Sequence, residues 1–380
     1  MAGFYTFLLI AFLGTTSGRL LRIGTAFYTL NQGWTFLALL ASTFALGRII
    51  SSFLGGELTK RFGSRVAGLG MLTLGLVGIA YSYLPPIYYL ALRIVHGISA
   101  GLAWPSLQAL TMSRAKREFR GRASSLYFTA TNLGWFLAFL LGGLIPKGSM
   151  LPSSIILITL GSILLLVKQE LVKERKRTKG KVFIPPLSAI VLGSIALGFM
   201  TLLVNTEVAV AIFGREFGRV MGGTLLALAA LIGSASGYYL NKVLIDVNES
   251  HLSMLIPPLV TTSSSFLIYF QPLSPLGLFL TKAFVSWWRS VMLALARVKD
   301  VGRRVGAFNA GGDAGRFLGS LIASFGPWTL PFLSLSSLAL ALTAWALSLR
   351  GAKLAGALEV RGEGPRNPKA GGSNSNVGEV

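Results

Sequence analysis

The stretch Gly55-Gly56-Glu57-Leu58-Thr59-Lys60-Arg61-Phe62-Gly63-Ser64-Arg65 is short, basic and rich in glycine, and long apolar runs flank it on both sides. In a bilayer the backbone must satisfy its own hydrogen bonds, so apolar runs of this length form helices. Lys and Arg concentrate in the cytoplasmic loops of membrane proteins. The stretch therefore predicts a tight cytoplasmic turn between two transmembrane helices.

The composition supports a membrane protein. Of 380 residues, 53% are hydrophobic and 13% are charged, and the mean hydropathy is +0.66. The net charge of +22 would favour a nucleic-acid partner in a soluble chain, but here the cations lie mostly between apolar runs, so we expect no nucleic acid. With no Cys and 2 His, we expect no disulfide, metal site or cofactor.

The chain contains twelve apolar segments of about 20 residues, the length that crosses a hydrocarbon core ~30 Å thick. We therefore expect an all-α integral membrane protein with spans at roughly 4–28, 34–54, 66–84, 87–112, 123–145, 150–168, 184–212, 220–240, 252–270, 275–297, 305–325 and 328–349. The predicted units are an N-terminal six-helix bundle (1–168), a cytoplasmic linker (169–183), a C-terminal six-helix bundle (184–350) and a disordered cytoplasmic tail (351–380).

The distribution of cations predicts the topology. With twelve spans, only Lys147, Arg215 and Arg219 fall in loops on one side, and all other loop cations fall on the opposite side. Cytoplasmic loops carry the excess of Lys and Arg. We expect a monomeric, multi-pass protein of the cell membrane, with both termini in the cytoplasm.

A faint repeat relates the two halves. Residues 55–60 align with 237–242, and Arg122 aligns with Arg304, at the same offset of 182 positions. Such repeats occur in transporters whose halves are related by an axis along the membrane normal, with the substrate path between them. We therefore expect two pseudo-symmetric bundles.

The loop resembles the signature of the major facilitator superfamily of secondary transporters, in which Gly, an apolar residue, Asp, a basic residue, Gly and further basic residues join spans 2 and 3. Gly56, Leu58, Arg61, Gly63 and Arg65 occupy the matching places, but Lys60 stands where the family has Asp. The segment 93–101 is similar to the family's Arg-x-x-x-Gly pattern in span 4.

This resemblance implies alternating access, in which two six-helix bundles rock about a central site. In the family the loop Asp helps to hold the outward-facing state at the start of span 11. Lys60 cannot do so, because a helix N-terminus repels a cation. The resemblance suggests that Glu57 replaces the Asp by pairing with Arg303 or Arg304. The Gly-Pro pair of the family's antiporters is absent, which counts against a drug/proton antiporter.

Charged residues inside the predicted spans are candidate site residues, because each costs about 2.5–3.5 kcal/mol to insert without a partner or a water-filled cavity. The cations are Arg19, Arg22, Arg48, Arg93, Lys282, Arg289 and Arg316, whereas the acids are only Glu207 and Asp313. This excess of positive charge predicts a pathway for an anion.

Arg19 and Arg22 share one helix face, and they either face a cavity or extend to the outer interface. We expect Arg48 to extend to the cytoplasmic interface. The predicted substrate-binding residues are Arg19, Arg22, Lys282, Arg289 and Arg316, from both halves.

The predicted proton-coupling residues are Glu207, Asp313 and Arg93. Glu207 lies among apolar residues without a cation in its own helix, so it either carries a proton or pairs with Arg22 or Arg19 across the cavity. Asp313 could instead simply pair with Arg316, and Arg93 with His96.

The sequence thus predicts a secondary transporter for a small anionic solute, coupled to protons, although it does not distinguish H⁺ from Na⁺. One alternative is an exporter of amphipathic drugs or lipids, which the many aromatic residues favour. Another is a scaffold or receptor on a transporter fold, in which the buried charges pair off completely. We expect no enzyme, since no nucleophile and base pair or phosphate-binding loop is present.

Overall fold

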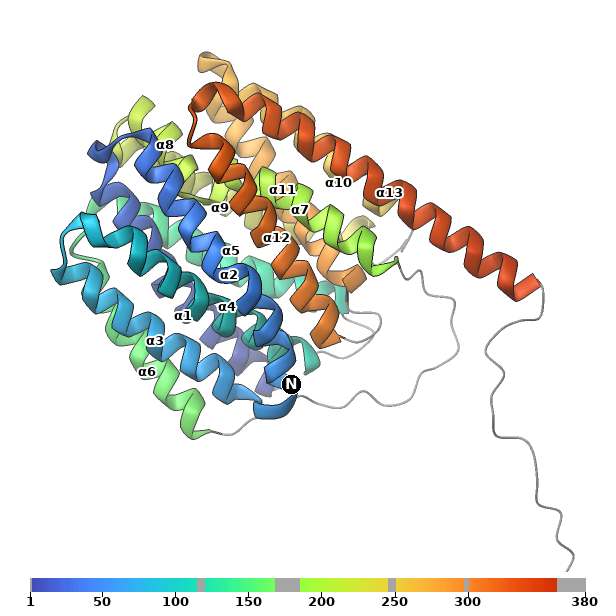
Figure 1. Cartoon of the computed structure of the whole chain (residues 1–380), viewed down its shortest axis with the longest axis horizontal. Coiled ribbons are helices and arrows are strands. Elements are labelled where there is room, and N and C mark those ends of the chain that lie inside the picture. Colours follow the sequence, from blue (N-terminus) through green and yellow to red (C-terminus); the bar gives the residue numbers. More distant parts are fainter. Residues whose placement is uncertain (1, 115–119, 168–184, 245–250, 297–300, 361–380) are drawn as a thin grey trace, which may run out of the picture.

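A computed structural model describes residues 2–114, 120–167, 185–244, 251–296 and 301–360. The described secondary-structure elements are all helices, as predicted, and the helices lie side by side (Figure 1). Their bounds are α1 Ala2–Tyr28, α2 Trp34–Phe62, α3 Ser64–Tyr83, α4 Tyr89–Ser113, α5 Arg120–Leu144, α6 Met150–Leu166, α7 Leu187–Asn205, α8 Glu207–Glu216, α9 Arg219–Leu244, α10 Ile256–Ser265, α11 Ser274–Ala296, α12 Val301–Ala323 and α13 Leu330–Val360.

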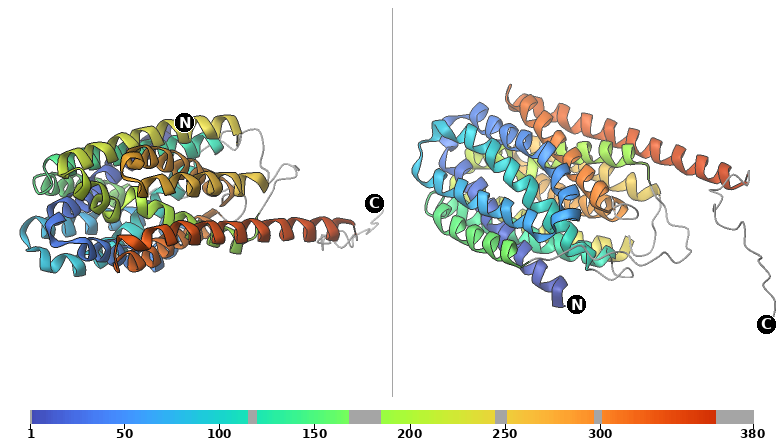
Figure 2. Two further views of the ribbon diagram at one scale, coloured as in Figure 1. Left: turned by 90° about the horizontal axis from the view of Figure 1, so that it is seen from above. Right: turned by 60° about the horizontal axis from the view of Figure 1, so that its bottom comes forward.

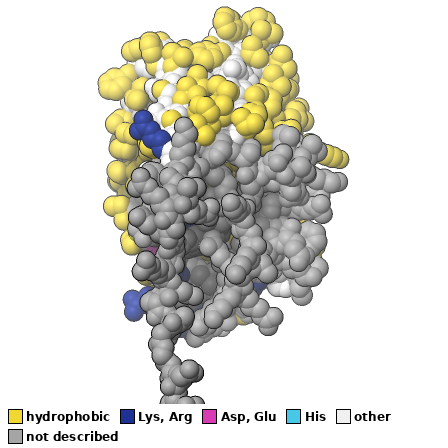
Figure 3. All heavy atoms as spheres, turned by 90° about the vertical axis from the view of Figure 1, so that its right-hand side faces the viewer, with side chains coloured by type: hydrophobic (Ala, Val, Ile, Leu, Met, Phe, Trp, Pro, Cys, Tyr) yellow, Lys and Arg dark blue, Asp and Glu magenta, His cyan; other side chains and the backbone are white. Residues whose placement is uncertain are grey.

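Apolar length supports a membrane location for these helices. By length and composition alone, 8 helical segments of the described chain can cross a membrane, and Met150–Leu166 is a shorter apolar helix. Apolar side chains cover much of the described surface in Figure 3, and isolated ones such as Ile50 and Ile87 are more than 70% exposed. A surface of this kind is stable in lipid and not in water.

The glycine-rich stretch is more helical than we predicted. Helix α2 continues to Phe62, well past the predicted end at residue 54, and α3 begins at Ser64. The turn is therefore reduced to Gly63, whose φ of 59° and ψ of −133° strongly favour a residue without Cβ. The predicted turn exists, but most of its motif lies on α2.

The seventh predicted span is not one helix. Helix α7 ends at Asn205, Thr206 is extended, and α8 starts at Glu207. The Thr206 side chain accepts a hydrogen bond from the amide of Val208 at 3.2 Å, which caps α8. A capping residue and an acidic first residue are stabilising at a helix start, so the break follows from the local sequence.

Two other segments also differ from the predicted spans. The ninth span contains α10 and a 3₁₀ turn over Phe266–Tyr269, and α10 starts only at Ile256, where prolines occupy its first turn. Helix α13 continues to Val360 and extends beyond the other helices (Figure 1 and Figure 2), so the tail was predicted to begin too early at 351. The predicted linker and residues 361–380 lie outside the described residues.

The helices form two bundles. In the first, α2 packs on α4, α3 on α6 and α1 on α5, and in the second α7 packs on α12 and α13, and α9 on α11. Two long contacts join the bundles, α2 with α12 and α5 with α9. This arrangement matches the predicted pair of pseudo-symmetric halves.

We call the end that carries Ala2 the N-terminal face and the opposite end, where α2 begins, the Trp34 face. At the Trp34 face, the indole of Trp34 donates to the carbonyl of Ala323 at 2.6 Å, and Thr35 donates to the carbonyl of Ser324 at 3.2 Å. The first and second bundles are therefore tied together at this end.

Close packing of α2 on α4 positions charged residues of the first bundle. A Cβ on Gly97 would lie 2.1 Å from the carbonyl oxygen of Phe44, and one on Gly47 would lie 2.2 Å from that of Ile94. Such small residues let membrane helices approach closely. The contact brings Arg93 of α4 and Arg48 of α2 to the interior.

Candidate functional site

The two bundles enclose a central cavity of about 60 Å³. Sites for organic ligands measure roughly 300–1,000 Å³, so a solute of that size fits only after the halves move apart. The charged side chains in the lining are Arg19, Arg22, Arg48, Arg289 and Arg316, and four aromatic rings join them, those of Phe44, Trp104, Tyr127 and Trp135. Both bundles contribute to this lining.

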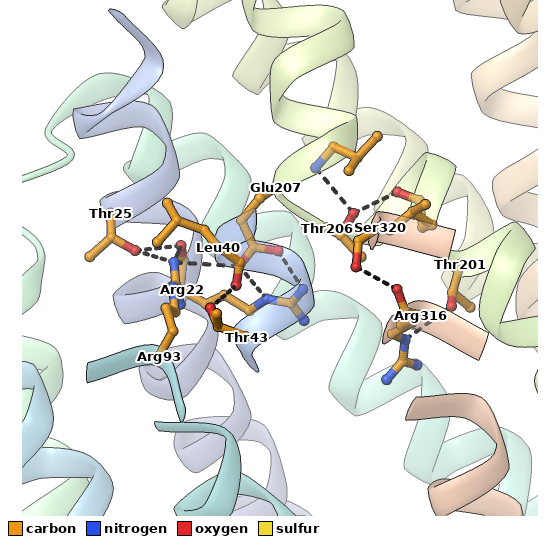
Figure 4. Close-up of polar contacts among 12 residues, drawn as sticks. Arg22, Thr25, Leu40, Thr43, Arg93, Thr201, Thr206, Glu207, Arg316 and Ser320 are labelled. Atoms are coloured by element: carbon orange, nitrogen blue, oxygen red, sulfur yellow. Dashed lines mark hydrogen bonds and ion pairs between the residues drawn. The ribbon is translucent and has the colours of Figure 1, made fainter. Parts of the chain in front are cut away.

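Glu207 joins the halves near the Trp34 face. Its carboxylate accepts hydrogen bonds from Arg22 Nε at 2.7 Å and Arg22 Nη2 at 2.5 Å, and Arg93 Nη2 lies 3.4 Å away (Figure 4). Arg93 also donates to the carbonyl of Arg22 at 2.6 Å and to the hydroxyl of Thr25. Glu207 is completely buried, and it belongs to the second bundle, whereas both arginines belong to the first.

Asp313 joins the halves along the contact between α2 and α12. It accepts hydrogen bonds from Arg316 Nη1 at 2.6 Å and from Ser52 Oγ at 2.8 Å, and Arg48 Nε lies 3.3 Å from its Oδ2. Arg316 also donates to the hydroxyl of Thr201 at 3.0 Å. The pairing of Asp313 with Arg316 was one of the predicted alternatives, but the contact with Arg48 across the halves was not predicted.

Arg48 corrects a prediction. We expected it to extend to the cytoplasmic interface, but its side chain is only 9% exposed and faces Asp313. The prediction was wrong because α2 continues to Phe62. At a rise of 1.5 Å per residue, the longer helix places Arg48 about 20 Å from either end.

Two cavity cations have no carboxylate partner among the described residues. Arg19 donates to the carbonyl of Thr131, and its guanidinium lies 4.4 Å from the centre of the Trp135 ring. Arg289 lies 4.8 Å from the centre of the Phe128 ring. Arg19 belongs to α1 and Arg289 to α11, so each bundle presents one such cation to the cavity.

Lys282 takes a different position from the other predicted substrate residues. It is completely buried and does not line the cavity. Its Nζ donates to the amide oxygen of Asn205 and lies 5.6 Å from the centre of the Trp135 ring. Asn205 lines the cavity and ends α7, so Lys282 contacts the break between α7 and α8.

The predicted conformational loop lies at the N-terminal face. Glu57 pairs with Lys60 at 2.9 Å on the surface of α2. Arg304 donates to the carbonyl of Pro185 at 2.7 Å, and the side chain of Arg303 lies outside the described residues. Pairing of Glu57 with Arg303 or Arg304 stays a prediction.

Sequence reasoning missed the break at Thr206 and the role of Trp135. The signal for the break was present, since a Thr followed by Glu is a typical helix start. Trp135 follows Gly134, where the family's antiporters have a proline, and it was not among the predicted site residues. Its ring contacts Arg19 and Lys282, which are far from it in sequence, and periodicity alone cannot show that.

Two helical bundles around a buried, charged cavity define the architecture of a membrane transporter. The chain belongs to the Major Facilitator Superfamily, whose sequence model matches residues 4–295.

Solved structures share this fold at low sequence identity. The human organic anion transporter MFSD10 (TETRAN) is 16% identical, with a TM-score of 0.66 over 90% of this chain and 98% of that one. The proton:xylose symporter XylE, solved with 6-bromo-6-deoxy-D-glucose, is 14% identical, with a TM-score of 0.67 over 93% of this chain and 96% of its own.

A curated relative matches part of the sequence. The 3-(3-hydroxy-phenyl)propionate transporter of Escherichia coli (strain K12) is 30% identical over 138 residues, which are 31% of this chain and 32% of the relative. The match spans about a third of that protein's length.

Proposed function

We propose that this transporter moves a small organic anion by alternating access and couples that movement to protons. The observation that carries the proposal is that Arg19 and Arg289 line one cavity from opposite bundles, with no carboxylate partner among the described residues. A buried cation without a counter-charge is unfavourable. A carboxylate between these two residues would supply that charge and would contact both halves at once.

The two inter-bundle ion pairs support alternating access. The Arg22–Glu207 pair lies toward the Trp34 face, and the Arg48–Asp313 pair lies nearer the middle of the α2–α12 contact. Opening either side of the cavity requires the pairs on that side to separate. An acid that separates from its arginines becomes accessible to a proton, and this is the role we propose for Glu207 and Asp313, with Arg93 as a partner.

The names of similar proteins support separate parts of this proposal, two of them the anionic substrate and one, a xylose symporter, only the coupling to protons. One structural neighbour is described as an organic anion transporter and another as a proton symporter. The curated relative is named for a hydroxyphenyl propionate, which is a carboxylate. We further propose a location in the cell membrane with both termini in the cytoplasm, a monomeric state, and H⁺ rather than Na⁺ as the coupling ion.

Uptake into proteoliposomes tests the proposal. The panel would contain benzoate, 3-(3-hydroxyphenyl)propionate and succinate as anions, xylose as a neutral solute and tetraphenylphosphonium as a hydrophobic cation. We expect saturable uptake of at least one anion, and stronger accumulation with an inward proton gradient than with an equal Na⁺ gradient. Flux of the hydrophobic cation without flux of any anion would overturn the anion assignment and favour an exporter of amphipathic compounds.

A further inference from the structure

The central cavity has two chemically different walls. Its Phe, Tyr and Trp rings all belong to the first bundle, and they are Phe44, Trp104, Tyr127 and Trp135. The described residues that the second bundle adds are amides and guanidinium groups, namely Asn205, Arg289, Asn309 and Arg316. We call these two sets the aromatic wall and the polar wall. A ligand between the walls therefore contacts rings on one side and hydrogen-bond donors on the other.

The aromatic wall is held in place by close packing. The Trp135 ring stacks on Phe139 with 5.2 Å between ring centres and 20° between the ring planes, and Trp135 is only 5% exposed. Trp104 lies against α1, where a Cβ on Gly18 would approach its ring to 2.7 Å. The buried Nε1 of Trp135 has no hydrogen-bond partner in the described chain, and a ligand can supply the acceptor that such a donor lacks. Rings that are fixed before binding stack on a flat ligand at little entropic cost.

Lys282 fixes the orientation of one donor in the polar wall. It lies outside the lining of the cavity, and its Nζ donates to Oδ1 of Asn205. An ammonium group has no acceptor, so the amide oxygen of Asn205 must face Lys282 and the amide nitrogen must face elsewhere. That nitrogen makes no hydrogen bond within the described part of the chain, and Asn205 lines the cavity. Asn205 is thereby set to donate to a ligand.

The direction of the Lys282 side chain is itself set by its neighbours. Its alkyl stem packs on α9, where a Cβ on Gly233 would lie 3.0 Å from Lys282 Cγ. Toward the first bundle, its Nζ lies 5.6 Å from the centre of the Trp135 ring. Lys282 is completely buried. The same lysine thus lies beside both walls, at Asn205 and at Trp135.

The donors of the polar wall favour an anion over a neutral ring. Arg289 has no carboxylate partner among the described residues, and its guanidinium lies 4.8 Å from the centre of the Phe128 ring. Asn205 adds an uncharged donor to the same lining. A carboxylate has two oxygens with several lone pairs, so one such group can accept from both residues. The two walls together fit a flat ring that carries an anionic group.

We propose that the substrate is an organic anion built on an aromatic ring, that this ring packs on the aromatic wall, and that Asn205 donates a hydrogen bond to the anionic group. Lys282 is the positioning residue that holds Asn205 in this orientation, and it acts without touching the substrate. This inference rests on the proposed function and adds to it the substrate class and two specificity-determining residues, Asn205 and Trp135. It also changes the role of Lys282, which we expected to bind the substrate directly.

A matched pair of anions tests the aromatic wall. Benzoate and cyclohexanecarboxylate share the carboxylate and the size of the ring, but only benzoate is flat and aromatic. In proteoliposomes we expect the parent protein to have a KM for benzoate about 10-fold below that for cyclohexanecarboxylate. Trp135→Leu should raise the KM for benzoate about 2- to 10-fold and leave that for cyclohexanecarboxylate nearly unchanged. Trp328→Leu, which replaces an exposed tryptophan outside this cavity, is the matched control.

A double-mutant cycle tests the role of Lys282. Asn205→Ala should raise the KM for benzoate about 10- to 100-fold, because a hydrogen bond to a charged group is lost, while kcat changes less than about 2-fold. Lys282→Met should raise the same KM at least about 3-fold, and the double variant should bind no more weakly than Asn205→Ala alone. Asn205→Asp keeps an acceptor for Lys282 but lacks the donor, so it should lose benzoate transport at an unchanged unfolding temperature.

Several results would count against this inference. Equal KM values for the two ring anions in the parent protein, or additive effects of Asn205→Ala and Lys282→Met, would overturn it. An Asn205→Asp protein with the KM of the parent would do the same. Uptake of succinate without uptake of either ring anion overturns the inference but leaves the proposed function intact. If the parent protein transports no anion of any kind, the proposed function itself fails.

Discussion

Replacement of Glu207 by Gln should open the Trp34 face of the transporter. The substitution keeps the size of the side chain but removes the charge that holds Arg22 at 2.5 and 2.7 Å and Arg93 at 3.4 Å. These contacts cross from the second bundle to the first, and they lie toward the same end of the molecule as the hydrogen bond from the Trp34 indole to the carbonyl of Ala323. Loss of the charge therefore acts on the contact between the bundles rather than on either bundle alone.

The size of the effect follows from the burial of the pair. Removal of one partner of a buried ion pair costs about 3–5 kcal/mol, and the Gln amide oxygen still accepts one hydrogen bond of about 1 kcal/mol. The closed arrangement should lose about 2–4 kcal/mol, which is a shift of about 30- to 1,000-fold in the equilibrium. When the face is open, water solvates both arginines, so the open arrangement loses little. An open state populated at about 1% would rise to between roughly 20% and 90%.

Spin labels on cysteines at Tyr83 and Phe325 would report this change, since both positions are exposed at the Trp34 face and lie on different bundles. We expect longer distances in Glu207→Gln, without longer distances between Phe62 and Tyr239 at the N-terminal face. Glu216→Gln, an exposed acid on the same helix α8, is the control. An unchanged distribution in Glu207→Gln, or lengthening at both faces together, would refute the reasoning.

Three further changes test other parts of the structure. Arg289→Gln should weaken anion transport about 10- to 100-fold in proteoliposomes, because it removes a cavity charge without a carboxylate partner in the described chain, whereas Arg219→Gln at the exposed Trp34 face should leave uptake unchanged. Gly63→Ala should destabilise the protein by about 1–3 kcal/mol, because the backbone conformation of Gly63 is strained for residues that have a Cβ. Thermal unfolding in detergent would measure this loss, and Gly148→Ala is the control. Thr206→Val should lower the unfolding temperature through loss of a helix cap worth about 1 kcal/mol, and equal stability would mean that the cap does not hold the break.

The fold could be predicted because it depends on patterns along the chain. Apolar runs of membrane length and the placement of basic loops gave all predicted spans a helical counterpart. What failed was local: the end of α2, the break before Glu207 and the end of α13. Each depends on a few residues that cap or continue a helix, and the hydropathy of a span does not report them.

The candidate site was predicted only in part. A charged residue inside a predicted span indicates that it has a partner of opposite charge or a cavity, but the sequence does not show which residue that partner is. Arg22 and Glu207 were expected to meet across the cavity as one of two alternatives, and they do. Arg48 and Asp313 were not expected to meet, although both were recognised as buried charges. Their pairing depends on the register of α2 against α12, and this register was misjudged with the end of α2.

The buried charges are divided unequally between the two bundles, and this division couples the cavity to the contact between the bundles. Of the described charged residues of the first bundle, Arg19, Arg22 and Arg48 line the cavity and Arg93 lies beside Glu207, whereas both buried acids come from the second bundle. Neither bundle can balance its own buried charge, so attraction between them depends on Glu207 and Asp313. The substrate anion that we propose would replace that attraction, because it would carry the same charge as the acids. In this proposal the arginines that pair with the acids also bind the substrate, and for this reason occupancy and conformation should change together.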